Sequence, residues 1–164
     1  MKRYFMKQTH TGDKARFLIY YENGEIAYRV TGEQQISGER LQIEREGGDA
    51  AAFIKHKNAI FVNRYSIEIG DKNVKVWQSL ATGIPVIQIS KLGWHIRGDL
   101  ISRSFDILNV DNSVEMIHSN RWGGWGSGYE MDIENEENEL LCLAIGVCID
   151  HSLLGTEQNP ITAN

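Results

Sequence analysis

One long apolar block, LLCLAIGVCIDHSLL at residues 140–154, ends a chain that otherwise alternates in short segments. Eleven of its fifteen residues are apolar, and only Gly146 interrupts the run from Leu140 to Ile149. A helix that is apolar on every side cannot lie on a hydrated surface and has to be enclosed. The block therefore predicts an interior helix near residues 138–153, and the elements that surround this helix determine the fold.

The length of the block argues against a membrane span. Fifteen helical residues reach about 22 Å, against roughly 30 Å for the hydrocarbon core of a bilayer. Cys142 and Cys148 would lie about 9 Å apart along the helix axis, too far for a disulfide or a shared metal ion. We expect two buried free thiols and a reducing, cytoplasmic location. The N-terminal MKRYFMKQTH also lacks the apolar core of a signal peptide.

Before this block, the dominant pattern is a period-two alternation rich in Ile, Val, Tyr and Phe. It predicts twelve short strands, and turn sequences such as Glu22-Asn23-Gly24 separate most of them. The short connections favour antiparallel neighbours. The predicted strands lie near residues 3–8, 14–21, 25–31, 39–45, 51–57, 64–70, 73–80, 85–91, 94–99, 103–109, 114–120 and 127–134.

Twelve strands in an open sheet would leave two edges open to aggregation, and closing the sheet removes both. A barrel of this size leaves room for one α-helix, about 10–12 Å across with its side chains. We therefore predict an all-β fold with one central helix: a closed twelve-stranded antiparallel β-barrel that encloses the C-terminal hydrophobic α-helix. The 164 residues form one domain over residues 1–155, followed by a tail at 156–164.

Three stretches carry a resemblance to a known family: FLIYYENGEIAYRVTG from Phe17, Trp94-His95-Ile96-Arg97-Gly98-Asp99, and LLCLAIGVCID from Leu140. With the strand pattern, they resemble the LURP-one-related group of the tubby C-terminal-like superfamily over about residues 3–154. The resemblance implies the same barrel around a central helix. The superfamily includes phosphoinositide-binding tubby proteins and phospholipid scramblases, so an anionic phospholipid is one partner that the resemblance suggests.

The charge is unevenly divided along the chain. Residues 1–103 carry 16 Lys and Arg against 11 Asp and Glu, whereas residues 104–164 carry Arg121 alone against 11 acidic residues. A basic surface for nucleic acid or anionic lipid is therefore possible only on the first part of this chain of net charge −5, and we expect no nucleic-acid partner. Cations on consecutive middle strands form a phosphate-binding patch if several share a face, and a solvated surface otherwise. They are Lys55, Lys57, Arg64, Lys72, Lys75, Lys91, Arg97 and Arg103.

The loop from Arg121 to Gly128 contains four glycines and the aromatic pair Trp122 and Trp125. Such a loop can bring its backbone close to a ligand and stack indole rings on it, or it can simply cover a barrel mouth. Together with Arg121, these tryptophans are candidate ligand- or partner-binding residues. The sequence is no phosphate-binding P-loop, because no Gly-Lys-Ser/Thr follows.

The sequence predicts no catalytic residues, cofactor or metal ligands. Asp150 and His151 end the expected helix, and we interpret Asp150 as a tether to a partner on the barrel wall. The alternative places a proton-transfer or metal site there, but the five histidines show no ligand spacing. The acidic run from Glu130 to Glu139 lacks the spacing of an EF-hand.

These observations favour a non-enzymatic binding or scaffold module, cytoplasmic or peripheral to the membrane, whose partner is an anionic phospholipid or another protein. Its oligomeric state is open. The alternative is a small-ligand carrier or enzyme with a barrel-mouth pocket near Trp122, Trp125, Asp150 and His151. A third option is scramblase-like lipid transport, which requires the helix to leave the barrel.

Overall fold

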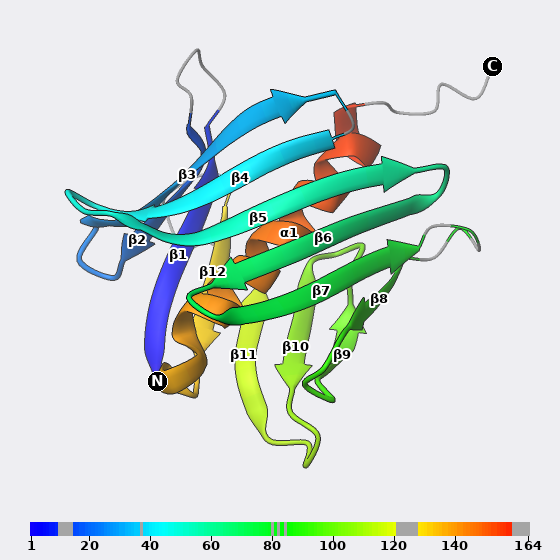
Figure 1. Cartoon of the computed structure of the whole chain (residues 1–164). Helices are drawn as coiled ribbons and strands as arrows, with labels where there is room; N and C mark the ends of the chain where they lie inside the picture. Colours follow the sequence, from blue (N-terminus) through cyan, green and yellow to red (C-terminus); the bar gives the residue numbers. More distant parts are fainter. Residues whose placement is uncertain are drawn as a thin grey trace.

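The computed structural model describes residues 1–9, 15–36, 38–79, 81, 83, 85–120 and 128–158. They form twelve antiparallel strands and one long helix, which confirms the predicted fold class (Figure 1). A short 3-10 helix, η1 (Glu136–Asn138), leads into the long helix α1 (Glu139–Gln158). The strands are β1 (Lys2–Gln8), β2 (Ala15–Tyr21), β3 (Ile26–Gln35), β4 (Gly38–Arg45), β5 (Ala50–Ala59), β6 (Val62–Ile69), β7 (Lys72–Ser79), β8 (Val86–Ile89), β9 (His95–Asp99), β10 (Ser104–Leu108), β11 (Val114–Ser119) and β12 (Tyr129–Ile133).

The strands form a single sheet that curls into a nearly closed barrel. Sequence neighbours pair from β1 to β8 and from β9 to β12, and β1 also pairs with β12. The order is therefore β8-β7-β6-β5-β4-β3-β2-β1-β12-β11-β10-β9. The two ends, β8 and β9, lie against each other and are only four and five residues long. Short strands at this seam leave little unpaired backbone to recruit another chain.

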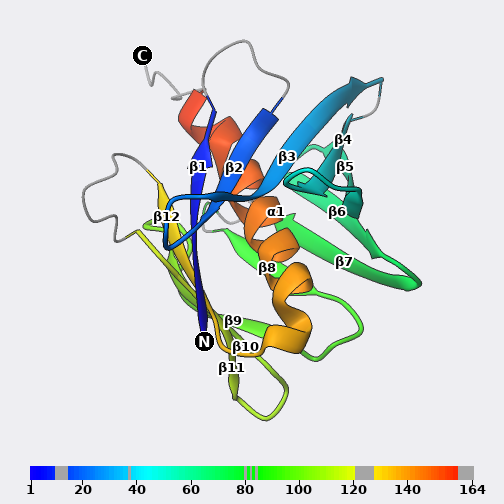
Figure 2. The same cartoon turned by 90° about the vertical axis from the view of Figure 1, so that its left-hand side faces the viewer.

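Helix α1 fills the barrel (Figure 2). Every residue from Cys142 to Asp150 that has a side chain is at most 1% accessible, so this stretch has no face on solvent. The wall supplies alternate residues to the same core, such as Leu41 and Ile43 of β4 and Ile54 of β5. The predicted interior position of the apolar block and the burial of both free cysteines are confirmed.

The start of α1 is anchored at one end of the barrel. The Glu139 carboxylate accepts a hydrogen bond from the Tyr4 hydroxyl at 2.5 Å and pairs with Lys2 Nζ at 3.1 Å. The Asn135 side chain caps the turn by accepting from the Glu137 backbone N–H at 3.2 Å. Acidic residues before α1 also suit the positive end of the helix dipole, as the sequence predicts.

The end of the helix was predicted wrongly. The helix continues to Gln158, so Asp150 and His151 lie inside it. The polar pair looked like a terminus because no local partner is visible in the sequence. Gly146 allows the wall to approach closely: a Cβ atom there would lie 3.1 Å from Met131 Sδ.

Candidate functional site

Cationic and aromatic side chains line up across the outer surface of β5 to β8. Lys57 lies opposite Arg64, Arg64 opposite Trp77, and Trp77 opposite Gln88. Each of these residues alternates with an inward neighbour, so all four side chains stand on the outer face. We call Lys57, Arg64, Trp77 and Gln88 the outer row.

A second row lies beside the first. Lys55 lies opposite Ser66, and Ser66 lies opposite Lys75, on the same face. Lys55 is half exposed and its Nζ lies 3.5 Å from a Glu68 carboxylate oxygen. Lys55, Lys57 and Lys75, three of the candidate binding residues from the sequence, therefore share a face with Arg64. We call these four cations and Trp77 the outer basic face.

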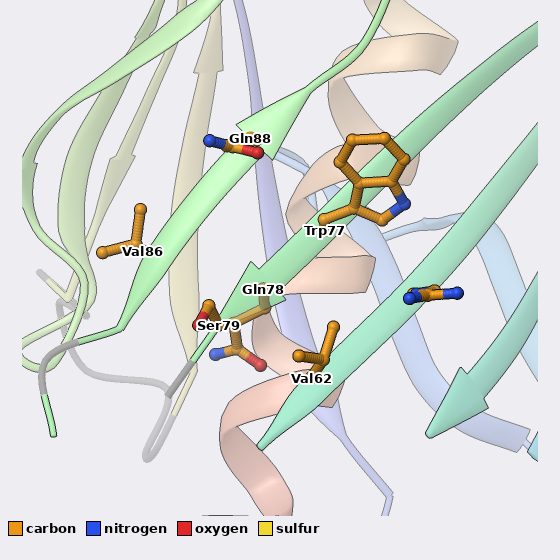
Figure 3. Close-up of a pocket in the computed structure, with 7 residues that line it drawn as sticks. Val62, Trp77, Gln78, Ser79, Val86 and Gln88 are labelled. Carbon is orange, nitrogen blue, oxygen red and sulfur yellow. The ribbon is translucent and has the colours of Figure 1, made fainter. Parts of the chain in front are cut away.

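A groove of about 380 Å³ runs along this face between β6, β7 and β8. In Figure 3 the labelled Trp77, Val86, Gln88 and Val62 surround its opening, with Gln78 beneath it. Trp77 is 42% exposed, an unusual fraction for so large an apolar side chain.

Exposed apolar residues occupy two turns at one end of this wall. Ile60 and Phe61 form the β5–β6 turn and are 84% and 65% exposed, and Phe61 has a positive φ of 62°. Ile36, in the β3–β4 turn, is fully exposed. Because Gly38 pairs with Lys57, both turns project from the same end of the barrel. We call Ile36, Ile60 and Phe61 the apolar tips.

The other predicted cations do not join this face through the strand register. Lys91 lies in the β8–β9 connection, and Arg97 lies on β9, across the seam, where its Nη2 contacts Asp106 at 2.7 Å. Arg103 is only 5% exposed, and its guanidinium lies 4.9 Å from the centre of the Tyr129 ring. Arg103 is thus a buried packing residue, and its assignment to a surface patch was wrong.

The glycine-rich loop with Arg121, Trp122 and Trp125 lies outside the described residues. Asp150, which the mouth-pocket alternative also needs, is completely enclosed. Its Oδ2 lies 2.9 Å from His118 Nε2 on β11, and both side chains have no exposed surface. The predicted tether between Asp150 and the barrel wall is therefore present.

A second polar cluster, which the sequence did not predict, lies on the inner side of the barrel wall formed by β4, β5 and β6. Glu39 and His56 face each other across β4 and β5, and His56 faces Tyr65 across β5 and β6. From α1, His151 reaches both ends of this row: Nε2 lies 2.7 Å from Glu39 Oε2 and Nδ1 lies 2.8 Å from the Tyr65 hydroxyl. We call Glu39, His56 and His151 the inner cluster.

The environment changes the acidity of several of these groups. Burial lowers the pKa of His56, although the hydrogen bond to Asn63 opposes the change, so the neutral imidazole is favoured. Burial disfavours the charged form of Tyr65 and of the Cys148 thiol in the same way, and because these groups are charged when deprotonated, burial raises the pKa of each and keeps both protonated. The sequence signal for the cluster was weak, since Glu39 and His56 become neighbours only once the register is known.

Comparison with known proteins agrees with this architecture. The model of the LURP-one-related family matches residues 2–150. The uncharacterized protein YxjI of Bacillus subtilis (strain 168) is 34% identical over 158 residues, which cover 96% of this chain and 97% of the Bacillus protein. The chain belongs to the LURP-one-related family.

A solved structure from the plant Arabidopsis thaliana extends the comparison of the LURP-one-related fold. It superimposes with a TM-score of 0.60 at 10% identity, covering 92% of this chain and 91% of the plant protein. At that identity the match concerns the fold alone. Within the described residues of this LURP-one-related chain, no helix has the combination of length and apolar character that a membrane span needs.

Proposed function

We propose that this LURP-one-related chain is a non-enzymatic module that docks on anionic phospholipid surfaces through the outer basic face and the apolar tips. The observation that carries the proposal is the alignment of Lys57, Arg64 and Trp77 across three strands, beside the exposed turn at Ile60 and Phe61. Cations, an indole ring and exposed aliphatic side chains are the combination that a membrane interface accommodates.

The cations provide the longer-ranged part of the attraction. A Lys or Arg close to an anionic bilayer contributes about 1 kcal/mol, so four cations supply at most about 4 kcal/mol. That corresponds to a roughly thousandfold increase in affinity. The Glu68 carboxylate near Lys55 reduces this total. The overall charge of −5 does not prevent docking, because the acidic excess lies in residues 104–164, whose strands β10 to β12 are far from β5, β6 and β7 in the strand order.

The apolar tips provide the short-ranged part. Burying an Ile or Phe side chain completely contributes about 1.5–3 kcal/mol, and an interface buries only part of each. Phe61 adopts a positive φ in the tight β5–β6 turn, and in this turn the side chains of both Ile60 and Phe61 are exposed to solvent. A turn that keeps Ile60 and Phe61 in water costs free energy, which insertion among lipid headgroups recovers.

Co-sedimentation with vesicles tests the proposal. The full chain is mixed with vesicles of phosphatidylcholine alone, or of phosphatidylcholine containing phosphatidylserine or a phosphoinositide, at low and moderate salt. We expect binding to the anionic vesicles that decreases as salt rises, because salt screens exposed charges. The double charge reversal Lys57→Glu with Arg64→Glu should abolish it, and Phe61→Ser should weaken it at every salt concentration.

The matched control is Lys7→Glu on β1, an outward-facing cation four strands from β5, which should leave vesicle binding nearly unchanged. Absence of binding to every anionic vesicle at low salt would refute the proposal, and a protein partner would then be the remaining candidate. Lys7→Glu changes the net charge by −2 and the double reversal changes it by −4. If Lys7→Glu lost about half as much binding free energy as the double reversal, net charge alone would explain the binding and the proposed face would be refuted.

A further inference from the structure

We propose that the inner cluster of Glu39, His56 and His151 is a binding site for a divalent transition-metal ion such as Zn²⁺. One ligand atom from each side chain lies within 4.8 Å of the other two. The residues come from β4, β5 and α1, so only the folded barrel assembles them. The site is independent of membrane docking, because the inner cluster and the outer basic face lie on opposite sides of the wall.

The residue types suit such an ion. Two imidazoles and one carboxylate form a common zinc-binding set, with a fourth position left for water or another ligand. The Glu39 and His151 side chains are only 9% and 12% exposed. A buried carboxylate is costly unless a cation or hydrogen bonds compensate its charge, and a bound metal ion does so strongly. Copper and nickel also bind nitrogen-rich sites of this kind.

Hydrogen bonds around the cluster orient His56 as a ligand. The Asn63 amide nitrogen donates to Gln78 Oε1 at 3.0 Å, so the amide oxygen of Asn63 is the acceptor that lies 2.9 Å from His56 Nε2. His56 Nε2 therefore carries the proton, and Nδ1 keeps its lone pair for a metal ion. An imidazole whose second nitrogen donates to a fixed oxygen is the usual arrangement around bound metals.

His151 is oriented in the same way. Its Nδ1 contacts the Tyr65 hydroxyl, which can either donate or accept, and its Nε2 points at Glu39. If a metal ion took the place of the proton between His151 Nε2 and Glu39, the imidazole would change tautomer: Nδ1 would carry the proton and donate a hydrogen bond to the Tyr65 hydroxyl oxygen. Tyr65 is therefore a positioning residue, and its ring also stacks on His56 with centroids 4.6 Å apart.

The distances require only a small adjustment. With Zn–N bonds of about 2.1 Å, the ligand atoms of a tetrahedral site lie roughly 3.4 Å apart. The His151–Glu39 pair is already closer than this, at 2.7 Å, and the widest separation in the cluster is at most 4.8 Å. Rotation of side chains by about an ångström at their ends closes the site. The bound ion would then link α1 directly to β4 and β5.

Titration of the chelator-treated full chain with Zn²⁺ by calorimetry, and with Co²⁺ by visible absorption, tests the site. We expect one ion per chain and the intense Co²⁺ bands of a four-coordinate site, without cysteine charge-transfer bands because both thiols are sealed in the core. His56→Ala and His151→Ala should each remove these bands. Tyr65→Phe should keep them and weaken affinity by about tenfold, as loss of an outer-shell partner does.

The control is His95→Ala, an exposed histidine on β9 that should bind Co²⁺ as the wild type does. Far-UV circular dichroism establishes that each variant is folded. If His151→Ala does not fold, His56→Ala and the wild-type Co²⁺ spectrum still decide the question. The proposal is overturned if the wild type binds neither ion stoichiometrically, or if the folded His56→Ala variant keeps the wild-type spectrum. Vesicle binding should not change in any of these variants.

Discussion

The buried pair of His118 on β11 and Asp150 on α1 allows a graded test of how the barrel holds its helix. His118 Nδ1 lies 2.8 Å from the Arg103 backbone carbonyl, which can only accept, so Nδ1 carries a proton. His118 Nε2 and Asp150 Oδ2 lie 2.9 Å apart and then share one further proton. Asp150 Oδ1 has no hydrogen-bond partner among the described residues. His118 is thus the side chain that compensates the buried Asp150 carboxyl.

Three substitutions should rank in a fixed order. Asp150→Asn keeps a donor to Nε2 and should cost about 1 kcal/mol or less. Asp150→Ala leaves one buried ring nitrogen unsatisfied and should cost about 1–3 kcal/mol. His118→Ala strands the carboxyl in the core and should cost about 3–5 kcal/mol. It also removes the ring that stacks on Phe105 with centroids 4.4 Å apart.

Equilibrium urea unfolding, followed by tryptophan fluorescence, measures these differences in the free energy of unfolding. His95→Ala, at an exposed position, should remain within about 0.5 kcal/mol of the wild type. The reasoning fails if His118→Ala costs less than about 1 kcal/mol, or if Asp150→Asn is as damaging as His118→Ala. The first result would mean that the buried carboxyl has another partner, and the second that the shared proton requires a carboxyl group.

Three further predictions concern the core and the seam. Because burial raises the pKa of Cys142 and Cys148 above the ordinary 9.0, the free energy of unfolding should fall as pH rises past that value, by roughly 1.4 kcal/mol per pH unit for each thiol. Urea unfolding should show this slope below pH 10.0, above which the buried Tyr65 also contributes, and the Cys→Ala double variant should lose the slope in that range. Gly146→Val should destabilise the protein by about 1–3 kcal/mol, because the added atoms press on Met131; an increase in the melting temperature would contradict it. Gly98→Ala should cost about 2 kcal/mol, since φ is 125° and a Cβ atom would lie 2.6 Å from a backbone oxygen of β10; unchanged unfolding would exclude this strain.

The sequence predicted the elements because each of their signals is local. Alternation with period two marks a half-buried strand, and all twelve strands are present. The uniformly apolar block marks an enclosed helix, and its central residues are fully buried. The end of that helix was missed for the opposite reason. Asp150 is polar in the sequence, but its partner His118 is 32 residues away, so local composition suggested a helix terminus.

The candidate sites depend on register, which local patterns do not supply. Lys57 and Arg64 share the outer basic face because they pair across the β5–β6 turn, a relation that only the length of the turn determines. Arg97, with the same chemistry, lies across the seam and pairs with Asp106. In the inner cluster, His151 bonds to Glu39 over 112 positions of sequence. No spacing rule for metal ligands covers such a separation.

The two proposed sites use the two faces of one wall, and this makes them separable. Lys57 follows His56 in β5, and Arg64 follows Asn63 in β6, so neighbouring residues point to opposite sides. Charge reversal at Lys57 changes the potential outside the barrel and leaves the imidazole of His56 in place. Removing the imidazole of His56 takes one of the three ligands from the inner cluster and leaves every cation of the outer basic face in place. Membrane docking and metal binding can therefore fail independently, and a variant that lost both at once would indicate damage to β5 itself.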